Sequence, residues 1–540
     1  MRRGMLVMCI SATALLLGCD LDLPATLYPQ MSQAQLVGIE RGIAAVEGKV
    51  TPNPGYAVRA AIVPHHLTAT ETLAAGVAML RREKPKRIVL LSPDHFSVCS
   101  EMLCTTNGVF ATPSGNVLTD ANAVRALLRF PSISLDPALF EREHGIFTII
   151  PYLSYYLPGV PIVPIAVTAD FRWRGRADAI LNAIKGIIDD ETLLLVSSDF
   201  SHYLPLREAD RMDEETAKMI FAKDFSGIAH LKNPDQSDCP ACLWVLARIA
   251  DEHGFYNPSV IRHTNSARIL NETATPSTTS HFAMVFYENA ALEALDPAFG
   301  GDVTVTRRAL GKPPTLTQEL SAFWSGTGAR IVNLEGPLGG DCLPSSNPYL
   351  FCNRTETWSA MKDLATHWGI VNNHMLDRWS EGITETERII RSSNEMPVTT
   401  TMHVEPELRL IAVTELMNPV GDERSLDLKA QASDVWQALR QAGSGALTVV
   451  LVHGGGEYHA LTSLDDEKYF ESFIDAGADA VIVAHSHVVG DMFIYKGKPI
   501  FRGLGNFVFD QFDSIPTSTA KLVRLRKEKD HVSFETLIAR

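Results

Sequence analysis

The hydrophobic pattern of the chain is a series of short apolar runs that end in polar residues. In the first half these runs include Ala60–Val63, Ile88–Leu91 and Leu193–Val196, and Pro-His, Ser-Pro-Asp-His or Ser-Ser-Asp sequences follow them. Continuous apolar stretches are typical of parallel strands buried on both faces, and the C-terminal ends of such strands deliver polar residues into a site. Because segments with helical spacing such as Thr70–Arg82 lie between the runs, the pattern predicts βαβ units.

The second half of the chain continues this alternation. Helical spacing is expected at 381–390 and 466–476, and apolar strands are expected at 301–305, 330–334, 408–414, 447–452 and 480–484. The predicted fold class is therefore α/β throughout.

The length of the chain requires more than one hydrophobic core. At 540 residues it should hold two or three domains. We expect a tether with a short helix at 20–56, a first α/β domain at 57–291 and a second at 300–540. A hydrophobic content of 46% and a charged content of 21% are ordinary for a folded soluble protein. The net charge of −15 argues against a nucleic-acid partner, whose binding surface would be basic.

The first nineteen residues have the composition of a targeting segment. Arg2 and Arg3 precede an apolar stretch, Met5–Leu17, that is too short to span a membrane. The sequence Leu-Leu-Gly-Cys ending at Cys19 resembles a bacterial lipobox, which implies cleavage before Cys19 and lipidation of its thiol. Asp20 resembles the residue that retains lipoproteins at the inner membrane of enteric bacteria. We therefore expect a protein on the extracytoplasmic, periplasmic face of a bacterial membrane; an uncleaved anchor and an ordinary secretory signal are the alternatives.

The remaining cysteines form three couples that are close in sequence. They are Cys99 and Cys104, Cys239 and Cys242, and Cys342 and Cys352. An oxidising compartment favours local disulfides, although six cysteines allow about 15 pairings. We predict local pairing for the first and third couples.

Three histidines at the ends of apolar runs are the strongest sign of chemistry. His453 closes one run, and His485 and His487 follow another as a His-x-His pair. Alternate residues on an extended chain face the same side, so His485 and His487 are expected to reach one metal cluster together. Histidines satisfied within a core are the alternative.

The first domain carries an ordered set of motifs: Pro64-His65, Ser92-Pro93-Asp94-His95, Thr112–Val117, Glu143-His144 and Ser197–His202. This set resembles the Memo family, whose microbial members are called AmmeMemoRadiSam system protein B and which is related to class III extradiol ring-cleaving dioxygenases. The resemblance implies a metal site for iron or copper at His65, His95 and Cys239, with Asp199, His202 and His144 lining the pocket.

Two departures from the Memo pattern bear on this site. Cys239 is followed by Pro240-Ala241-Cys242, so a disulfide would remove its thiolate. The residues after His144 lack the Ser and Glu usual in that motif. A pocket without chemistry and a redox role for the Cys-x-x-Cys sequence are the alternatives here.

The second domain carries another ordered set: Gly301-Asp302, Asn333-Leu334-Glu335, Asn372-Asn373-His374, His453–Tyr458, His485–His487 and Leu504–Asp510. This set resembles the CapA family of poly-γ-glutamate capsule synthesis, which is built on a calcineurin-like metallophosphoesterase α/β sandwich. The resemblance implies one or two divalent ions of the manganese, iron or zinc type. The implied metal ligands are Asp302, Glu335, Asn373, His453, His485 and His487; His374 is the implied catalytic acid, and Asn333, Glu457 and Asn506 are implied to orient the ligands.

One departure weakens the analogy with phosphatases. Calcineurin-like phosphatases begin with Asp-x-His, whereas this chain has Thr304 in place of the histidine. The leading interpretation is a lipid-anchored, metal-dependent hydrolase or transferase acting on a cell-envelope polymer, such as a poly-γ-glutamate-like one, or on a phosphoester, fused to a Memo-like metal-binding domain. A non-catalytic metal-binding scaffold that anchors a polymer is one alternative, and an oxidative metalloenzyme in the first domain is another.

Overall fold

The structure is a computed structural model. It describes residues 26–28, 31–168, 171–292, 296–304, 306, 318–324, 328–342, 349–400, 403–404, 406–416, 432–441 and 445–540. Cys19 and Asp20, and with them the predicted signal segment, lie outside the described residues. Among the helices in this part of the chain, none combines the length and the apolar character needed to cross a membrane.

The first domain is organised around an eight-stranded sheet with strand order β10-β11-β2-β9-β3-β8-β4-β7. Its central strands run parallel, as the apolar runs predict. β11 and β4 are antiparallel to their neighbours β2 and β8. The strands are β2 (Val58–Val63), β3 (Arg87–Asp94), β4 (Leu103–Thr105), β7 (Ile133–Leu135), β8 (Ile162–Thr168), β9 (Thr192–Ser197), β10 (Pro258–Asn265) and β11 (Ser280–Tyr287).

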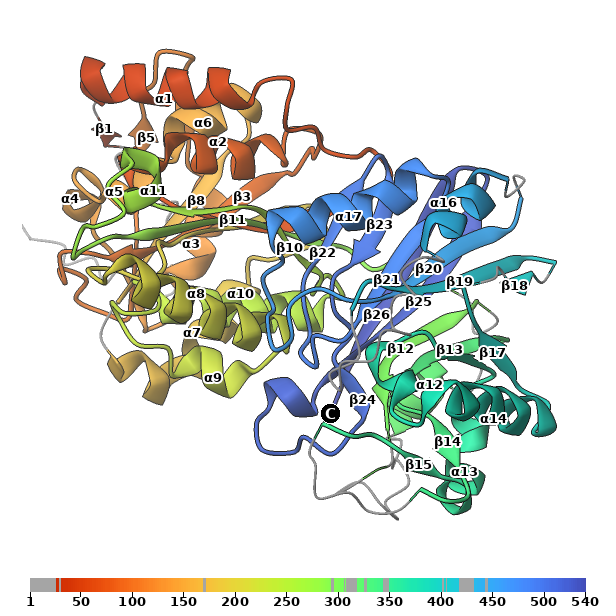
Figure 1. Cartoon of the computed structure of the whole chain (residues 1–540). Coiled ribbons are helices and arrows are strands. Elements are labelled where there is room, and N and C mark those ends of the chain that lie inside the picture. Colours follow the sequence, from red (N-terminus) through yellow and green to blue (C-terminus); the bar gives the residue numbers. More distant parts are fainter. Residues whose placement is uncertain are drawn as a thin grey trace, which may run out of the picture.

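Helices cover both faces of this sheet (Figure 1). α1 (Gln33–Val46), α2 (Thr70–Ala78) and α6 (Ile150–Tyr156) lie on one side, and α7 (Ala177–Lys185), α8 (Leu206–Phe221) and α10 (Pro240–Glu252) lie on the other. Alternate strand residues separate between the two layers: Ala61 and Val63 join the core under α2, whereas Ala60 and Ile62 join the core under α10. This two-sided burial explains why the strands read as unbroken apolar runs.

The predicted short helix of the tether is present as α1, and it is part of the folded domain. Ser32 caps its first turn in a reciprocal capping box with Gln35. Gly42 lies against Thr70 so closely that a Cβ there would meet the Thr70 carbonyl oxygen at 2.6 Å. α1 is therefore packed directly on the beginning of α2.

The second domain is a sandwich of two sheets. One has strand order β17-β16-β13-β12-β25-β26, with β24 also pairing with β12, and the other has the order β18-β19-β20-β21-β23-β22. Side chains from both sheets, among them Phe299, Ile331, Leu410 and Ile482, belong to one buried cluster. The first sheet consists of β12 (Ala298–Val303), β13 (Arg330–Leu334), β16 (His367–Gly369), β17 (Met396–Val398), β24 (Asn506–Val508), β25 (Ala520–Glu528) and β26 (His531–Ala539). The second consists of β18 (His403–Val404), β19 (Leu408–Thr414), β20 (Leu447–His453), β21 (Ala480–Ala484), β22 (Met492–Tyr495) and β23 (Lys498–Phe501).

Helices cover the outer faces of the sandwich, which completes a four-layer α/β arrangement. α12 (Gln318–Trp324), α13 (Thr355–Met361) and α14 (Trp379–Ser392) pack through Trp324, Trp358 and Ile390 on the first sheet. α16 (Ala432–Gln441) and α17 (Leu464–Asp475) pack through Val435 and Phe473 on the second. The predicted α/β class therefore holds for both halves of the chain.

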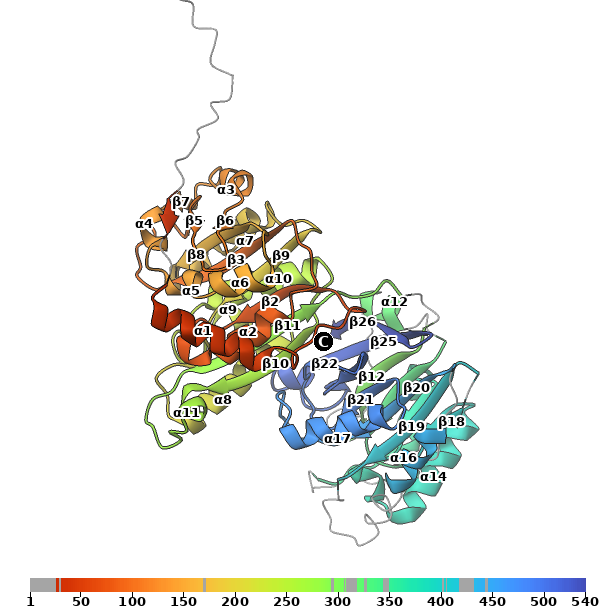
Figure 2. The ribbon, with the colours of Figure 1, turned by 90° about the horizontal axis from the view of Figure 1, so that it is seen from above.

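The two domains lie side by side, with β10, β22 and β26 near their junction (Figure 2). Tyr56 donates a hydrogen bond to the carbonyl of Val532 at 2.5 Å, and its ring stacks on Phe534. The amide of Val260 donates to the Asp491 carboxylate at 2.9 Å. The junction is thus made of specific hydrogen bonds and aromatic packing.

Candidate metal centres

The second domain brings its predicted ligands together at the C-terminal ends of parallel strands. Asp302 lies at the end of β12, Glu335 follows β13, and His453 ends β20. His485 and His487 follow β21, which pairs with β20 in parallel. Parallel strands in adjacent sheets therefore direct residues from distant parts of the sequence to one end of the sandwich.

A buried carboxylate pair and an imidazole form the tightest cluster in this centre. Ligand atoms of Asp302, Glu335 and His487 all lie within 4.8 Å of one another. Nε2 of His487 is 3.8 Å from Glu335 Oε1, and Nδ1 of His487 is 3.5 Å from Asp302 Oδ2. Both Glu335 oxygens and Nδ1 of His485 are buried and lack a hydrogen-bond partner among the described residues. Buried polar atoms without partners are costly, so a ligand at this point would stabilise them.

The geometry of the His-x-His pair differs from the strand alternation that we predicted. β21 ends at Ala484, and His485 and His487 have φ values of 94° and 55°. Positive φ is unfavourable for residues with a Cβ, and such strain is concentrated at functional sites. The two imidazoles therefore reach one site through a left-handed turn, in which their ring centroids are 6.0 Å apart.

Three amide side chains contact the imidazoles; the resemblance implies an orienting role for Asn333 and Asn506 and a metal-ligand role for Asn373. Asn506 Oδ1 is 2.9 Å from His487 Nδ1, which leaves Nε2 of His487 facing Glu335. Asn333 donates to Asp302 Oδ1 at 2.7 Å and lies 3.1 Å from His453 Nδ1. Asn373 Oδ1 lies 2.9 Å from His453 Nε2. Such outer contacts fix the ring orientation of ligating histidines.

Glu457 approaches the cluster from the loop that follows β20. Its Oε1 is 3.8 Å from His487 Nε2, and its side chain is half-exposed. The neighbouring Tyr458 packs on His487 with 5.6 Å between ring centroids, and its hydroxyl accepts a hydrogen bond from Gln511. This loop therefore forms the solvent side of the centre.

His374 lies between the buried carboxylate and a second acid. Its Nε2 is 3.7 Å from Glu335 Oε1, and its Nδ1 is 3.0 Å from Asp377 Oδ2. A carboxylate behind an imidazole fixes the ring and supports a proton at the other nitrogen. This placement suits His374 as an acid that acts beside the metal ligands.

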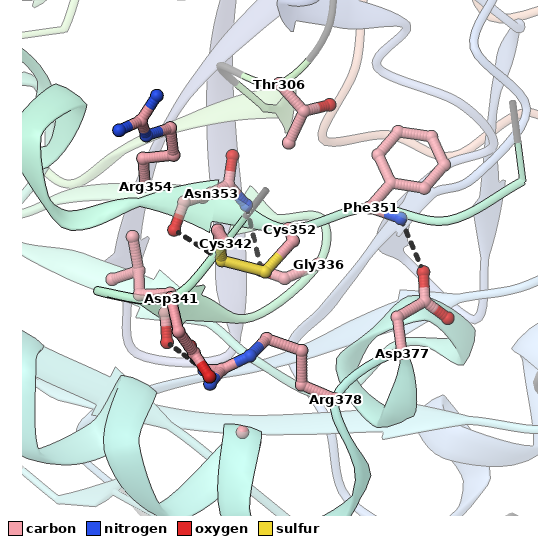
Figure 3. The surroundings of a disulfide bond; sticks show 12 residues. Thr306, Gly336, Asp341, Cys342, Phe351, Cys352, Asn353, Arg354, Asp377 and Arg378 are labelled. Carbon is pink, nitrogen blue, oxygen red and sulfur yellow. Dashed lines mark hydrogen bonds and ion pairs between the residues drawn. A yellow bond between two sulfur atoms is a disulfide. The ribbon is translucent and has the colours of Figure 1, made fainter. Parts of the chain in front are cut away.

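A disulfide braces the segment that holds His374 (Figure 3). Cys342 and Cys352 are bonded, and the adjacent Phe351 amide donates to Asp377 Oδ2 at 2.7 Å. The Phe351 ring packs on His374 with 4.1 Å between centroids. Phe351 and Asp377 were not singled out from the sequence, because neither belongs to the metal-ligand motifs.

The position that lacks the phosphatase histidine has a structural role. Thr304 is buried, and its hydroxyl donates to Asn353 Oδ1 at 3.1 Å. Asn353 in turn donates to the carbonyls of Glu335 and Gly336 at 3.0 Å each. Thr304 thus holds the turn that carries Glu335.

The protonation states in this centre follow from burial and from neighbouring charges. Burial raises the pKa of Glu335 to about 7. Burial and the nearby imidazoles lower the pKa of His485 to about 4 and hold that of His453 well below its usual range. For His487 burial opposes protonation, but Glu335 and Asp302 raise its pKa to about 9. Neutral imidazoles at His453 and His485 are the form that binds metal.

The first domain contains a second cluster, at the C-terminal ends of β2, β3 and β9. His65 Nε2 is 3.1 Å from Asp238 Oδ2 and 3.4 Å from Asp199 Oδ2. His95 Nε2 is 3.7 Å from the same Asp238 oxygen. Three of the predicted residues, His65, His95 and Asp199, are thus brought together, and Asp238 joins them.

The outer nitrogens of these histidines are held by hydrogen bonds. His95 Nδ1 lies 2.6 Å from Glu143 Oε1, and His65 Nδ1 lies 3.0 Å from the Ser197 hydroxyl. Asp199 is held by His281, whose Nδ1 is 2.8 Å from Asp199 Oδ1. These contacts direct both Nε2 atoms toward Asp238.

Of the predicted pocket residues, His144 also belongs to this cluster, because its ligand atom lies within 4.8 Å of those of His65 and His95. The His144 ring is 3.9 Å from the His95 ring and is partly exposed. Burial and the neighbouring imidazoles lower the pKa of His144 to about 4. His202 Nδ1 is hydrogen-bonded to the Phe200 carbonyl at 2.6 Å.

Cys239 is joined to Cys242 and therefore carries no thiolate in this structure. The predicted disulfides Cys99–Cys104 and Cys342–Cys352 are also present. Sequence reasoning missed Asp238 and His281. Asp238 stands directly before Cys239, so the stretch Ser237-Asp238-Cys239 was the available signal, whereas His281 lies far away on β11 with no motif around it.

In the first-domain cluster, the imidazoles and carboxylates shift the pKa values of one another toward the charged forms. Burial opposes protonation of His95, yet the hydrogen bonds that its ring donates to Asp238 and Glu143 raise its pKa to about 10. Burial also opposes ionisation of Asp199, but His65 and His281 lower its pKa to about 2. The residues present in both centres, imidazoles together with buried carboxylates, fit a divalent cation.

Comparisons with known proteins agree with the two halves of the fold. Residues 27–274 match the family model of Memo-like proteins. Residues 297–419 and 401–511 match the model of the bacterial capsule synthesis protein PGA_cap.

Several curated relatives are MEMO1 family proteins. A MEMO1 family protein of Caldivirga maquilingensis is 28% identical over 200 residues, which cover 36% of this chain and 65% of the relative. A MEMO1 family protein of Pyrobaculum arsenaticum is 27% identical over 226 residues, covering 41% of this chain and 76% of the relative. A MEMO1 family protein of Saccharolobus solfataricus is 30% identical over 175 residues, covering 31% and 61%.

Among solved structures, an uncharacterized Escherichia coli K12 protein is similar over 42% of this chain and 99% of its own, with 14% identity and a TM-score of 0.28. That similarity carries no argument about fold or function. The family models and the two candidate centres instead define the organisation: the chain joins a Memo-like domain to a PGA_cap domain.

Proposed function

We propose that the PGA_cap domain is a metal-dependent hydrolase or transferase. One observation carries the proposal: buried Glu335, whose oxygens have no hydrogen-bond partner within the described ranges, lies beside Asp302 and His487. An ionised carboxylate in this position is costly without a cation, and imidazoles and carboxylates are the ligands that manganese, iron and zinc accept.

The residues divide into those that would hold the ion and those that would act beside it. Asp302, Glu335 and His487 would hold one ion, and His453, His485 and Asn373 supply further donors. A divalent ion bound here would lower the pKa of a bound water and stabilise charge on a phosphoryl or acyl oxygen. His374 would donate a proton to the leaving group, with Asp377 fixing its ring at 3.0 Å.

The substrate class that we propose is a cell-envelope polymer, poly-γ-glutamate-like or phosphoester-linked, handled on the extracytoplasmic face of a membrane. The name of the PGA_cap model supports a capsule-related polymer. The sequence around Cys19 and three disulfides among the described residues support an oxidising compartment.

The test combines metal analysis with turnover by detergent-solubilised full-length protein. Phosphodiester and γ-glutamyl peptide substrates are assayed after chelation and after addition of Mn²⁺, Fe²⁺ or Zn²⁺. We expect metal-dependent turnover that His485→Ala abolishes, whereas His230→Ala, which removes an exposed histidine of the other domain, leaves turnover unchanged. Turnover that persists after chelation, or that survives His485→Ala, would contradict the proposal.

A binding role is the second candidate, and Thr304 favours it. The side chain that would supply another imidazole is instead a buried threonine bonded to Asn353. In a scaffold that anchors an anionic polymer, the metal would bind stoichiometrically without turnover. Retention of the polymer on the metal-loaded protein, together with no cleavage of any tested substrate, would establish this alternative.

A further inference from the structure

We propose that the Memo-like domain binds a hard divalent cation through His65, His95 and the carboxylate of Asp238, with no thiolate ligand. The proposal concerns the first domain alone and does not depend on the proposed hydrolase. It differs from the site expected from the sequence, in which Cys239 supplies the third ligand.

The geometry places one carboxylate oxygen opposite both imidazoles. Asp238 Oδ2 is 3.1 Å from His65 Nε2 and 3.7 Å from His95 Nε2. These three groups are buried or nearly so, with Asp238 only 7% exposed. Two imidazole nitrogens and one carboxylate oxygen that converge in this way form a 2-His-1-carboxylate set, which is a recognised arrangement for divalent iron and similar ions.

The carboxylate is held in place by its own hydrogen bonds. Ser198 donates from its hydroxyl to Asp238 Oδ1 at 2.8 Å, and the Asp238 amide donates to the Asp199 carbonyl at 3.2 Å. Oδ1 thus accepts the Ser198 hydroxyl, while Oδ2 faces the histidines and also accepts a long hydrogen bond from the Asp199 amide at 3.4 Å. Fixation of one oxygen and presentation of the other is what a preformed ligand requires.

The neighbouring sulfur is directed elsewhere. Cys239 is bonded to Cys242 in the first turn of α10 and belongs to the apolar cluster beneath that helix, where it is 1% exposed. Its amide donates to the Ser237 hydroxyl at 3.1 Å. Consecutive residues therefore point in different directions: Asp238 toward the histidines and Cys239 into the core.

The second carboxylate adds oxygen character to the site. Asp199 Oδ2 is 3.4 Å from His65 Nε2, and His65, Asp199 and Asp238 form a set whose ligand atoms lie within 4.8 Å of one another. Two imidazoles with one or two carboxylates suit Fe²⁺, Mn²⁺ or Zn²⁺. Cu⁺ prefers thiolate and thioether ligands, which this site lacks.

Cobalt is the probe for the test, because thiolate-bound Co²⁺ has an intense sulfur-to-metal charge-transfer band that carboxylate-bound Co²⁺ lacks. Full-length protein carrying His485→Ala and His487→Ala, which disable the second centre, is titrated with Co²⁺ with and without prior reduction by a phosphine reductant that contains no thiol. We expect one bound ion, no charge-transfer band in either condition, and unchanged binding in Cys239→Ser/Cys242→Ser.

The decisive variant is Asp238→Asn, which keeps the size of the side chain and removes the charge. We expect Co²⁺ affinity to fall by about 100-fold or more. Loss of a residue that only orients a ligand costs about 10–100-fold, and loss of a direct ligand should cost at least as much. Asp235→Asn removes a half-buried carboxylate from the same loop and is expected to bind like the parent. Circular dichroism and thermal unfolding confirm that each variant is folded, and Asp238→Ala serves as a second substitution if Asp238→Asn does not fold.

Three outcomes would overturn the proposal. The first is a charge-transfer band that appears on reduction and disappears in Cys239→Ser. The second is Co²⁺ affinity in a folded Asp238→Asn protein equal to that of Asp235→Asn. The third is the absence of any ion from the parent protein, which would leave the histidine–aspartate cluster as a structural network.

Discussion

At the scale of single residues, the buried acids of the second centre differ in the hydrogen bonds that their oxygens accept. Asp302 has Asn333 on one oxygen and the His485 amide on the other, at 2.7 and 3.2 Å. Neither oxygen of Glu335 accepts a hydrogen bond from the part of the chain that the structure describes. The two acids therefore differ in what the loss of their charge would do to the metal-free protein.

Glu335→Gln is expected to stabilise the metal-free protein while it weakens metal binding. A neutral amide of the same shape costs less to bury than a carboxylate whose oxygens accept no hydrogen bond among the described residues, by about 1–3 kcal/mol. Thermal unfolding of chelator-treated protein measures the gain, and the shift of the melting temperature on addition of Mn²⁺ measures the loss. Glu457→Gln is the matched control, because its half-exposed side chain should leave the metal-free stability unchanged. A lower melting temperature for metal-free Glu335→Gln would contradict this account.

His374→Asn is expected to separate catalysis from metal binding. General acid catalysis by a positioned side chain contributes roughly 10²–10⁴-fold, so kcat should fall within that range. The bound metal should stay at the parental level, because Nε2 of His374 is 3.7 Å from Glu335 and the ligand cluster of Asp302, Glu335 and His487 forms without His374. Turnover and metal content are measured on the same preparation. A parallel fall of both quantities would show that His374 acts as a ligand.

Sequence analysis identified the residues at the ends of apolar strands, but it missed Asp238, which lies outside any strand. His65, His95, His453 and Asp302 follow or end such strands, so their convergence could be expected from parallel pairing. Asp238 follows a loop and precedes a helix, and its contacts with His65 and His95 appear only in the structure. Periodicity carries no information about such positions.

At the scale of elements, the second centre relies on glycines that let neighbouring segments lie close to its acidic residues. Gly301 lies so close to β24 that a Cβ would meet the Gly505 carbonyl oxygen at 1.9 Å. Gly336, with φ at 86°, faces Phe351, where a Cβ would meet the Phe351 Cβ at 2.5 Å. The Gly-Asp and Glu-Gly pairs of the sequence motifs thus have a physical basis: each acid is followed or preceded by a glycine that permits close approach of a neighbouring segment.

Removal of the Cys342–Cys352 disulfide is expected to impair His374 without removing the metal. Disulfides typically contribute about 2–4 kcal/mol, and this one fixes Phe351, whose amide and ring both bear on the His374–Asp377 pair. Cys342→Ser/Cys352→Ser should lower both the melting temperature and kcat, with metal content retained.

Cys99→Ser/Cys104→Ser provides the comparison for that experiment, since this disulfide lies in the first domain. It should reduce stability while leaving turnover by the second domain unchanged. Equal losses of kcat in the two double variants would show that general destabilisation, and not the support of His374, is responsible.

At the scale of the whole molecule, α8 links the first domain to a loop of the second candidate centre. Its Asp213 lies 2.9 Å from the Ser201 hydroxyl and 2.8 Å from His263 Nε2, within the first domain. The next residue, Glu214, accepts hydrogen bonds from the amides of Ala460 and Leu461 at 2.5 and 3.3 Å. The chain pattern predicted neither contact, because hydrophobic periodicity describes each domain separately and says nothing of what joins them.

The loop that Glu214 holds is the one that carries Glu457 and Tyr458 to the second centre. Glu457 is 3.8 Å from His487, and Tyr458 packs on the same ring. Because residues 454–461 have no strand or helix of their own, their position depends on contacts at both ends. The Memo-like domain therefore supports the solvent side of the second centre through Glu214 and through the apolar packing of Ala460 and Leu461.

Glu214→Gln is expected to loosen this loop. The glutamine can still accept one amide hydrogen bond but turns a donor toward the other amide, at a cost of about 1–3 kcal/mol. Hydrogen exchange should accelerate at residues 454–461, and turnover should fall several-fold with no change in metal bound to the first domain. Glu215→Gln is the control, because that neighbour is more exposed and its ion-pair partner is Lys218 of the same helix. If hydrogen exchange at 454–461 is the same in the two variants, the first domain does not support the second centre. If exchange is faster in Glu214→Gln alone, the fusion of the two domains maintains the geometry of the site.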